Sequence, residues 1–320
     1  MKRLLLLFAV VALSAAVNAQ KLDVGLTAGT TGIGVELGAK LCEPLRVRVG
    51  ISYFPRITVN RSYGMSSVSD IKTEESQEER IERICRKIGE FINSDHVDPY
   101  LGMEHSVNFW NAKVLVDAYP FRNKNWHITA GVYVGPKKMG EAINLHNEAP
   151  TIMGIVMYNG VYDKLKSDLD AYRAEFPDDP DYIPSVSFMD VQFSPLPEQW
   201  EEMQKLGRIV VPMGQSADGR DYNLEPTGDG VMYADIIAHI VKPYIGAGYN
   251  MSFGQDKRWN FCVDAGVLIF GESPHVYDNQ GVCLTHGVAE IGGEVGKLVS
   301  LVNKMPVYPN LEVRLSYTIK

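Results

Sequence analysis

Cysteine is scarce in this sequence, and the few cysteines do not form a metal-binding motif. The 320 residues contain four cysteines and seven histidines, with no CxxC pair and no Cys/His pattern of zinc-ligand spacing. A serine-nucleophile motif is also missing. We therefore expect no metal site, no cofactor, no catalytic residues and no enzyme activity.

Long hydrophobic runs and an excess of basic residues are also missing. After residue 20 no apolar run approaches the ~18 residues that a membrane-spanning helix needs. The chain has 31 Lys and Arg against 39 Asp and Glu, a formal net charge of -8, which makes nucleic acid an unsuitable partner. Mean hydropathy is -0.10. A chain of this kind can cross a membrane only with strands, which hide half of their apolar residues by alternation.

The first twenty residues have the pattern of a secretory signal peptide. Lys2 and Arg3 precede an apolar run over 4–17, and Ala19 ends a small-residue cleavage site. This pattern predicts a signal peptide over residues 1–19, cleavage after Ala19 and export. The mature chain would begin at Gln20 rather than at a cysteine, which argues against a lipoprotein anchor.

Eight segments of the remaining chain alternate apolar and polar residues, as half-buried strands do. They begin near Leu22, Ile33, Leu45, Ala112, His127, Met232, Asn260 and Leu311, and the sixth runs from about 232 to 251 as one long strand. Helical spacing of apolar residues appears near 81–92, 161–176, 197–207 and 288–302. Two extra short strands are expected near 208–212 and 220–224.

The lengths of the connections are sorted. Short connections follow the second, fourth and sixth strands, whereas long inserts at about 61–104, 140–230 and 272–305 follow the third, fifth and seventh. In an up-and-down barrel every second connection lies at the same end, and outer-membrane barrels have short periplasmic turns and long outer loops. We therefore predict an all-β fold for residues 20–320: an antiparallel transmembrane β-barrel of eight strands, or ten, with partly helical extracellular inserts.

One face of the predicted strands is apolar, and the other carries charge. The charged set is Glu36, Lys40, Arg46, Arg48, Lys113, Asp117, Lys242, Asp264, Glu312 and Arg314. An Arg or Lys facing mid-bilayer lipid costs roughly 2–4 kcal/mol, so we expect this set to face the lumen and fill it with paired charges. A soluble lipocalin-like barrel, with the two faces exchanged, is the alternative. An aromatic girdle is expected from Tyr53, Trp126, Tyr133, Tyr249, Trp259 and Tyr317.

The even number of cysteines and the predicted export permit disulfides, and free cysteines are the alternative, because a chain of this length can be stable without disulfides. The sorting of connections places Cys85 and Cys283 at the outward end, and Cys42 and Cys262 at the other end on strands that are not neighbours. A disulfide needs Cα atoms within about 7 Å, so Cys85–Cys283 is the pairing that this geometry leaves open.

Several stretches resemble the outer-membrane β-barrel proteins of the Bacteroidota. The resemblance is carried by residues 18–20, 114–121 (VLVDAYPF), 129–133, 242–249 (KPYIGAGY), 264–267 and 308–311, and the chain departs from the usual terminal aromatic residue by ending at Lys320. It implies an outer-membrane location, with membrane lipid as a partner. We expect a structural or surface-recognition role, with an extracellular protein or glycan bound through the long inserts. A small-solute channel is the alternative, and an outer-membrane enzyme using polar strand-end residues such as His105, Ser106, Asp235 and His239 comes third.

Overall fold

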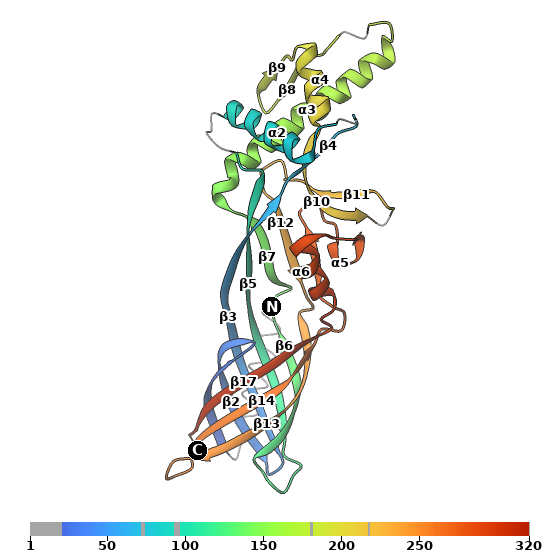
Figure 1. Ribbon diagram of the computed structural model, residues 1–320. Coiled ribbons are helices and arrows are strands. Elements are labelled where there is room, and N and C mark those ends of the chain that lie inside the picture. Colours follow the sequence, from blue (N-terminus) through green and yellow to red (C-terminus); the bar gives the residue numbers. More distant parts are fainter. Residues whose placement is uncertain (1–20, 72–73, 93–96, 180–181, 217, 320) are drawn as a thin grey trace.

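The structure is a computed structural model that describes residues 21–71, 74–92, 97–179, 182–216 and 218–319. The predicted signal peptide and its cleavage site lie outside the described residues. Figure 1 shows a β-barrel at one end of an elongated molecule, a stalk of extended strands above it and a helical head at the far end.

The barrel is closed by eight antiparallel strands. They are β1 (Lys21–Gly29), β2 (Gly32–Cys42), β3 (Leu45–Gly64), β5 (Tyr100–Ala118), β6 (Trp126–Val134), β13 (Val241–Phe253), β14 (Trp259–Ile269) and β17 (Val307–Thr318). Each strand pairs with the next in this order, and β17 pairs with β1, from Asp23 opposite Thr318 to Gly29 opposite Glu312. The predicted eight-strand, up-and-down antiparallel barrel is confirmed.

Chain connections at the two ends of the barrel differ as predicted. The β2–β3, β5–β6 and β13–β14 connections are short turns at one end, where Lys21 and Thr318 also lie. At the β13–β14 turn, Gly254 and Lys257 take positive φ angles of 86° and 50°. The three long connections, over 65–99, 135–240 and 270–306, all leave from the opposite end and build the stalk and head (Figure 1).

The stalk is a sheet that grows out of two barrel strands. β3 and β5 continue past the barrel and are joined by β7 (Lys138–Asn144), β12 (Tyr233–Ile237) and β15 (His275–Asp278), in the order β3-β5-β7-β12-β15. Because β3 reaches Gly64 and β5 begins at Tyr100, the first insert is shorter than the predicted 61–104. The single strand predicted over 232–251 is wrong, since residues 238–240 separate β12, in the stalk, from β13, in the barrel.

The head contains most of the helices. They are η1 (His146–Glu148), α2 (Gln77–Ile92), α3 (Ala149–Glu175) and α4 (Pro197–Leu206), with α5 (Leu284–Gly287) and α6 (Gly293–Asn303) beside the stalk. The accompanying short strands are β4 (Ser66–Val68), β8 (Val186–Phe188), β9 (Val191–Phe193), β10 (Arg208–Ser216), β11 (Asp221–Leu224) and β16 (Val288–Ala289). The predictions for α2, α4, β10 and β11 are confirmed. The helix predicted from 161 begins at Ala149, and the helix predicted over 288–302 is β16 followed by α6.

Apolar side chains from the helices form the core of the head. Ile84 of α2 and Leu165 of α3 are fully buried, each in its own cluster, and a third cluster around Leu101 and Ile152 joins the head to the top of the stalk. α4 starts with Pro197 at its first position and stops at Gly207, whose φ is 74°. Within the described residues, no helix is both long and apolar enough to cross a membrane.

Candidate functional site

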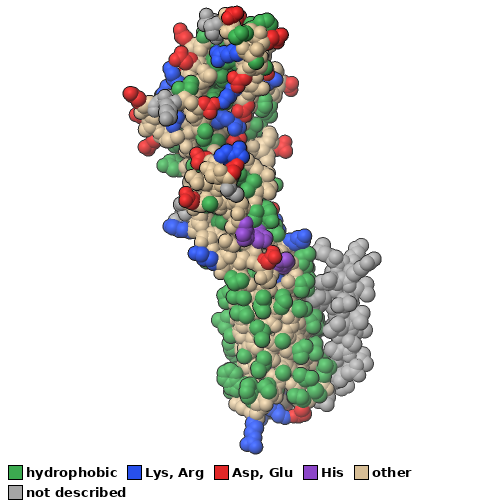
Figure 2. All heavy atoms as spheres, turned by 90° about the vertical axis from the view of Figure 1, so that its right-hand side faces the viewer, with side chains coloured by type: hydrophobic (Ala, Val, Ile, Leu, Met, Phe, Trp, Pro, Cys, Tyr) green, Lys and Arg blue, Asp and Glu red, His purple; other side chains and the backbone are tan. Residues whose placement is uncertain are grey.

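The outer wall of the barrel is apolar. Leu26, Leu37, Ile51, Ile245 and Leu311, from five different strands, are each more than half exposed. On the face of the barrel that Figure 2 shows, apolar side chains form a band, and charged side chains gather beyond its two ends. The soluble lipocalin-like alternative is therefore wrong, because its apolar face would point inward.

Aromatic side chains lie at both edges of this apolar wall. At the short-turn end, the rings of Trp126 and Tyr249 are 5.0 Å apart, and those of Trp259 and Tyr317 are 5.1 Å apart. At the other end, Tyr53 of β3 lies opposite Trp110 of β5, and both are exposed. Five of the six predicted girdle residues thus lie on the outer wall. The sixth, Tyr133, was wrongly assigned, since it is fully buried in the lumen on the same strand face as Thr129.

The charged face of the strands points into the lumen, as predicted. Nine residues of the predicted set are buried there: Glu36, Arg46, Arg48, Lys113, Asp117, Lys242, Asp264, Glu312 and Arg314. Lys40 is the exception, because it lies at the rim of the short-turn end, where its ammonium is 3.8 Å from the exposed Glu43 carboxylate. Lys242 is buried as predicted, but its ammonium has no hydrogen-bond partner among the described residues.

Arg48 lies at the centre of the lumen network. Its guanidinium donates to Asp117 at 2.8 Å and to Asp264 at 3.1 Å, and it lies 3.4 Å from Glu36. Thr129 donates a further hydrogen bond of 2.8 Å to Asp117. A buried guanidinium with three carboxylates on its five donors forms a charge-assisted cluster whose geometry is fixed from several strands at once.

Two more cations complete the pairing around Glu36. The Lys113 ammonium lies between Glu36 and Glu312, at 2.6 Å from the latter, and the Arg314 guanidinium is 3.3 Å from Glu36. Arg46 pairs with Asp23 nearer the short-turn end. Among the described residues, the lumen therefore holds five cations and five carboxylates: Arg46, Arg48, Lys113, Lys242, Arg314, Asp23, Glu36, Asp117, Asp264 and Glu312.

Besides Thr129, several other polar residues of this network were not among the predicted site residues. His127 is fully buried and 2.7 Å from Asp264, Asn250 lies 3.5 Å from Arg314, and Asp23 pairs with Arg46. Asp23 and His127 occupy the lumen positions of the alternating pattern. The alternating pattern was therefore the signal that could have identified both residues. It would have done so if uncharged positions and positions at strand ends had been counted among the lumen residues.

An aromatic and apolar layer lies in the lumen beside Lys113, which is opposite Tyr133 across β5 and β6. Leu115, Tyr133, Tyr244 and Leu268 form a buried cluster, and Tyr308 packs against it and donates to the Thr30 carbonyl at 2.8 Å. A Cβ on Gly246 would collide with the Tyr244 hydroxyl, so glycine at this lumen position makes room for the ring. The ion pairs and this layer therefore both occupy the lumen.

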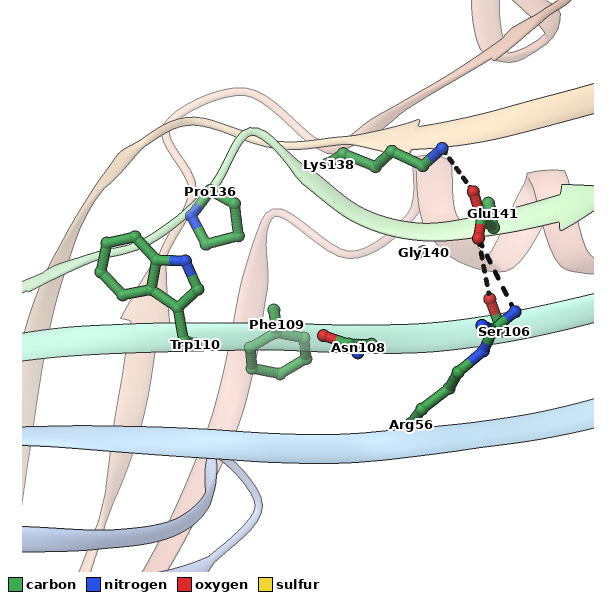
Figure 3. A pocket seen from close by; sticks show the side chains of 9 residues that line it. All are labelled: Arg56, Ser106, Asn108, Phe109, Trp110, Pro136, Lys138, Gly140 and Glu141. Atoms are coloured by element: carbon green, nitrogen blue, oxygen red, sulfur yellow. Dashed lines mark hydrogen bonds and ion pairs between the residues drawn. The ribbon is translucent and has the colours of Figure 1, made fainter. Parts of the chain in front are cut away.

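A notch opens in the wall where β5 changes its partner. β5 pairs with β6 up to Ala112, opposite Val134, and with β7 from Val107, opposite Gly140, so residues 108–111 have no partner on that side. The resulting cavity of about 300 Å³ is shown in Figure 3. It is lined by Arg56, Ser106, Asn108, Phe109, Trp110, Pro136, Lys138, Gly140 and Glu141.

The charges at the notch are already paired. Lys138 lies 2.5 Å from Glu141 and 2.8 Å from Asp235, and Arg56 lies 2.5 Å from Glu104. The hydrogen bond from Lys138 lowers the pKa of Glu141 below its usual value. An aromatic wall beside a balanced ionic wall suits an amphipathic group rather than a simple anion.

The polar strand-end residues and the cysteines lie at several places in the structure. Ser106 and Asp235 both lie at the notch, whereas the ring of His105 is held by the Tyr63 hydroxyl at 2.6 Å. The expected Cys85–Cys283 disulfide is not formed, because all four cysteines are free. Cys85 packs among isoleucines of α2 in the head, and burial raises its pKa to about 11; Cys283 lies beside the stalk, before α5.

Comparison with solved structures gives chains of low sequence identity to this one. These include CarO of Acinetobacter baumannii (12% identity, TM-score 0.37, covering 92% of this chain and 96% of that chain) and CarO2 of the same organism (12%, 0.38, 93% and 98%). A major outer membrane protein from Thermus thermophilus is also similar (10%, 0.33, 93% and 98%). These TM-scores are too low to support a conclusion about this chain. The evidence for the barrel is the chain's own strand pairing. No protein-family model and no curated protein matches the sequence.

Proposed function

We propose that this protein is an outer-membrane β-barrel that anchors a stalk and head at the cell surface, where they bind an extracellular protein or glycan. The observation that carries the proposal is the reversed polarity of the barrel. Exposed Leu, Ile and Val side chains cover its outside, and fully buried Arg48, Lys113 and Arg314 fill its inside.

An apolar outer wall of this kind is suited to contact with membrane lipid. In water, a continuous apolar band around a barrel would be far larger than the patches that soluble monomers expose. β1 has 9 residues and β13 has 13, which is enough for the 9–11 residues that a tilted strand needs to cross the hydrocarbon layer. The outer membrane is where exported barrels of this kind are inserted.

The filled lumen supports an anchor over the alternative of a small-solute channel. Eight strands enclose a space that side chains can fill, and here paired charges and the Tyr133–Tyr244 layer occupy it. A steady path for solutes would require breaking ion pairs that several strands hold in place. The barrel therefore serves as a support for the parts above it.

Surface recognition is assigned to the stalk and head, since they are the large structures at the long-connection end. Short turns and both ends of the described chain lie at the opposite end, the arrangement in which outer-membrane barrels face the periplasm. Long surface segments on a rigid scaffold are where binding residues most often lie. The notch at Trp110 and Lys138, between wall and stalk, offers a cavity for a ligand group.

Tag accessibility on intact cells tests this orientation. One variant carries an epitope tag in the β10–β11 turn at Gly219, where no atom crowds the backbone, and a matched variant carries it between Gln255 and Asp256. We expect antibody to label the first tag on intact cells and the second tag only after the outer membrane is permeabilised. Labelling of the second tag alone on intact cells would invert the topology and contradict the proposal.

A further inference from the structure

We propose that His275, Cys283 and His286 form a binding site for a divalent transition-metal ion, with Zn²⁺ as the ion that their chemistry fits best. Their ligand atoms all lie within 4.8 Å of one another. The sequence alone did not indicate this site, because His275 and Cys283 are farther apart along the chain than the paired ligands of common zinc motifs and meet only through a turn.

A short, well-braced turn brings the first two ligands together. His275 begins β15, and Tyr277 of the same strand forms an isolated antiparallel bridge with Cys283. Between them, the buried Asp278 carboxylate accepts hydrogen bonds of 3.0 Å from the backbone N–H groups of Gln280 and Val282. The bridge and the carboxylate fix the turn, so the approach of His275 and Cys283 belongs to the fold of this segment.

The third ligand follows one turn of chain later. His286 lies in α5, where its backbone N–H donates to the Cys283 carbonyl at 3.3 Å, and its Nδ1 is 3.9 Å from the Cys283 Sγ. The rings of His275 and His286 are steeply inclined to each other, at 71°, with centroids 4.9 Å apart. Two imidazoles and a thiol thus lie on one small part of the surface.

The three ligand atoms converge on a common point. The Thr285 hydroxyl oxygen lies 3.1 Å from the Cys283 Sγ, 3.4 Å from the His275 Nδ1 and 3.2 Å from the His286 Nδ1. In a tetrahedral zinc site, with bonds of about 2.0–2.3 Å, ligand atoms are about 3.3–3.8 Å apart. Small side-chain rotations, with Thr285 turning aside, would bring these atoms to that spacing.

Ligand chemistry favours Zn²⁺ over Ca²⁺ or Mg²⁺. A thiolate and two imidazoles are soft and borderline ligands, which bind zinc, whereas the hard cations take oxygen. The Glu272 carboxylate lies 3.8 Å from the His275 Nε2, the ring nitrogen that faces away from the other ligands, where it can accept a hydrogen bond and orient the ring. Water then takes the fourth position. The half-exposed and exposed positions of the three ligands leave the site open to ions from solution.

A second group of potential metal ligands lies in the lumen, but it is not free to bind an ion from solution. His127, Cys262 and Asp264 also lie close together, but they are buried in the lumen. There His127 is hydrogen-bonded to Asp264, which also pairs with Arg48, so the carboxylate already has charged partners and the group is closed off from solvent. The ligand set of His275, Cys283 and His286 contains no carboxylate that pairs with a buried arginine, and it is open to solvent.

The site lies where the stalk meets the barrel. His275 is paired with Ile237 of β12, which in turn is opposite Lys138 of β7 at the notch. Figure 2 shows histidine side chains exposed just above the apolar band of the barrel. A bound ion would tie β15 to α5 and so fix the α5–α6 segment against the base of the stalk.

Cobalt binding tests the site, because Co²⁺ takes zinc positions and gives a thiolate-to-metal absorption when a cysteine is a ligand. The full chain, folded in detergent and reduced, is titrated with Co²⁺ and then with Zn²⁺. We expect one equivalent of Co²⁺ with thiolate absorption, displaced by Zn²⁺. Cys283→Ser should abolish the absorption, and His286→Ala should lower Co²⁺ affinity by about tenfold or more, since even outer-shell losses cost about 10–100-fold.

Two matched variants control the result. Cys42→Ser removes a half-exposed cysteine at the other end of the barrel, and His146→Ala removes a histidine of the η1 turn; both should bind Co²⁺ as the unmodified chain does. Heat-modifiable migration verifies that the barrel of each variant is folded. Because His286 is exposed, the Co²⁺ affinity of His286→Ala can be measured even if Cys283→Ser does not fold. Absence of thiolate absorption, or the same affinity in His286→Ala as in His146→Ala, would overturn the proposal.

Discussion

The barrel and the head solve the same packing problem with opposite polarity. In the barrel, Arg48 and Lys113 are fully buried and Leu26 is about two-thirds exposed. In the head, Ile84 and Leu165 are fully buried, and the charged residues lie on the surface (Figure 2). With the proposed membrane location of the barrel, the difference means that the inward face of an element is set by its surroundings, lipid for the barrel wall and water for the head, and not by a general rule that apolar residues lie inside.

A single strand passes through both environments. The lower part of β3, up to Tyr53, alternates between buried lumen residues and exposed apolar ones, whereas its upper part is exposed almost throughout. Substitutions along β3 can therefore separate the two environments without changing the element that carries them.

The largest effect is expected from a charge on the barrel wall. Val49→Arg places a guanidinium in the middle of the lower part of β3, facing lipid, at a cost of roughly 2–4 kcal/mol, and should prevent stable insertion into lipid vesicles. Val59→Arg, on the exposed upper part of the same strand, should insert normally. Folding is read from heat-modifiable migration, and equal insertion of the two variants would show that the wall does not face lipid.

The next effect concerns the lumen. Arg48→Met should still insert but should lower the free energy of unfolding by about 3–5 kcal/mol, because Asp117 and Asp264 lose their buried cation. Lys40→Met removes only the rim pair with Glu43, and about 0–1 kcal/mol is expected. Urea titration in lipid vesicles measures both, and similar values for the two variants would mean that the buried network is not what holds the lumen together.

A core substitution in the head should leave the barrel untouched. Leu165→Ala removes a fully buried side chain of α3 and should destabilise the head by about 2–5 kcal/mol. Limited proteolysis should then cut the head faster, while heat-modifiable migration of the barrel stays unchanged. Leu301→Ala, at an exposed position of α6, serves as the control. Loss of the folded barrel in Leu165→Ala would show that the two regions are not independent.

The smallest effect is expected at the notch. The pKa of Glu141 is lowered in the folded state by its hydrogen bond from Lys138, so the pair stabilises at neutral pH and its contribution is lost as pH falls and Glu141 protonates. Partly exposed pairs contribute about 0.2–1 kcal/mol. Amide hydrogen exchange of β7 should accelerate at acid pH, after correction for intrinsic rates. Glu141→Gln should remove this pH dependence, and its persistence would assign it to another group.

The barrel was predictable from the sequence, because a strand with one apolar and one charged face shows alternating apolar and charged residues along the chain. The pattern Arg46, Arg48 against Val47, Val49 indicated the two faces of β3, and the lengths of connections indicated the end at which the inserts lie. In the stalk the signal is lost. Both faces of upper β3 meet solvent, so the polar residues after Asn60 hid the continuation of the strand.

Sites that depend on tertiary contacts were not predictable. The notch exists because β5 exchanges β6 for β7 between Ala112 and Val107, and neither residue marks the exchange in the sequence. The free Cys85 and Cys283 illustrate the same limit. Sorting by barrel end placed them together, but α2 carries Cys85 into the core of the head, and the β15 turn places Cys283 beside His275.

Conductance in planar lipid bilayers tests the central claim most directly, that this barrel is an anchor filled by its own side chains. The purified full chain is added to the bilayer beside an open porin of known current as a positive control. We expect insertion without a steady current, because paired charges around Arg48 and the layer at Tyr133 and Tyr244 occupy the lumen. A reproducible open-channel current of porin size would contradict the account and favour a solute channel.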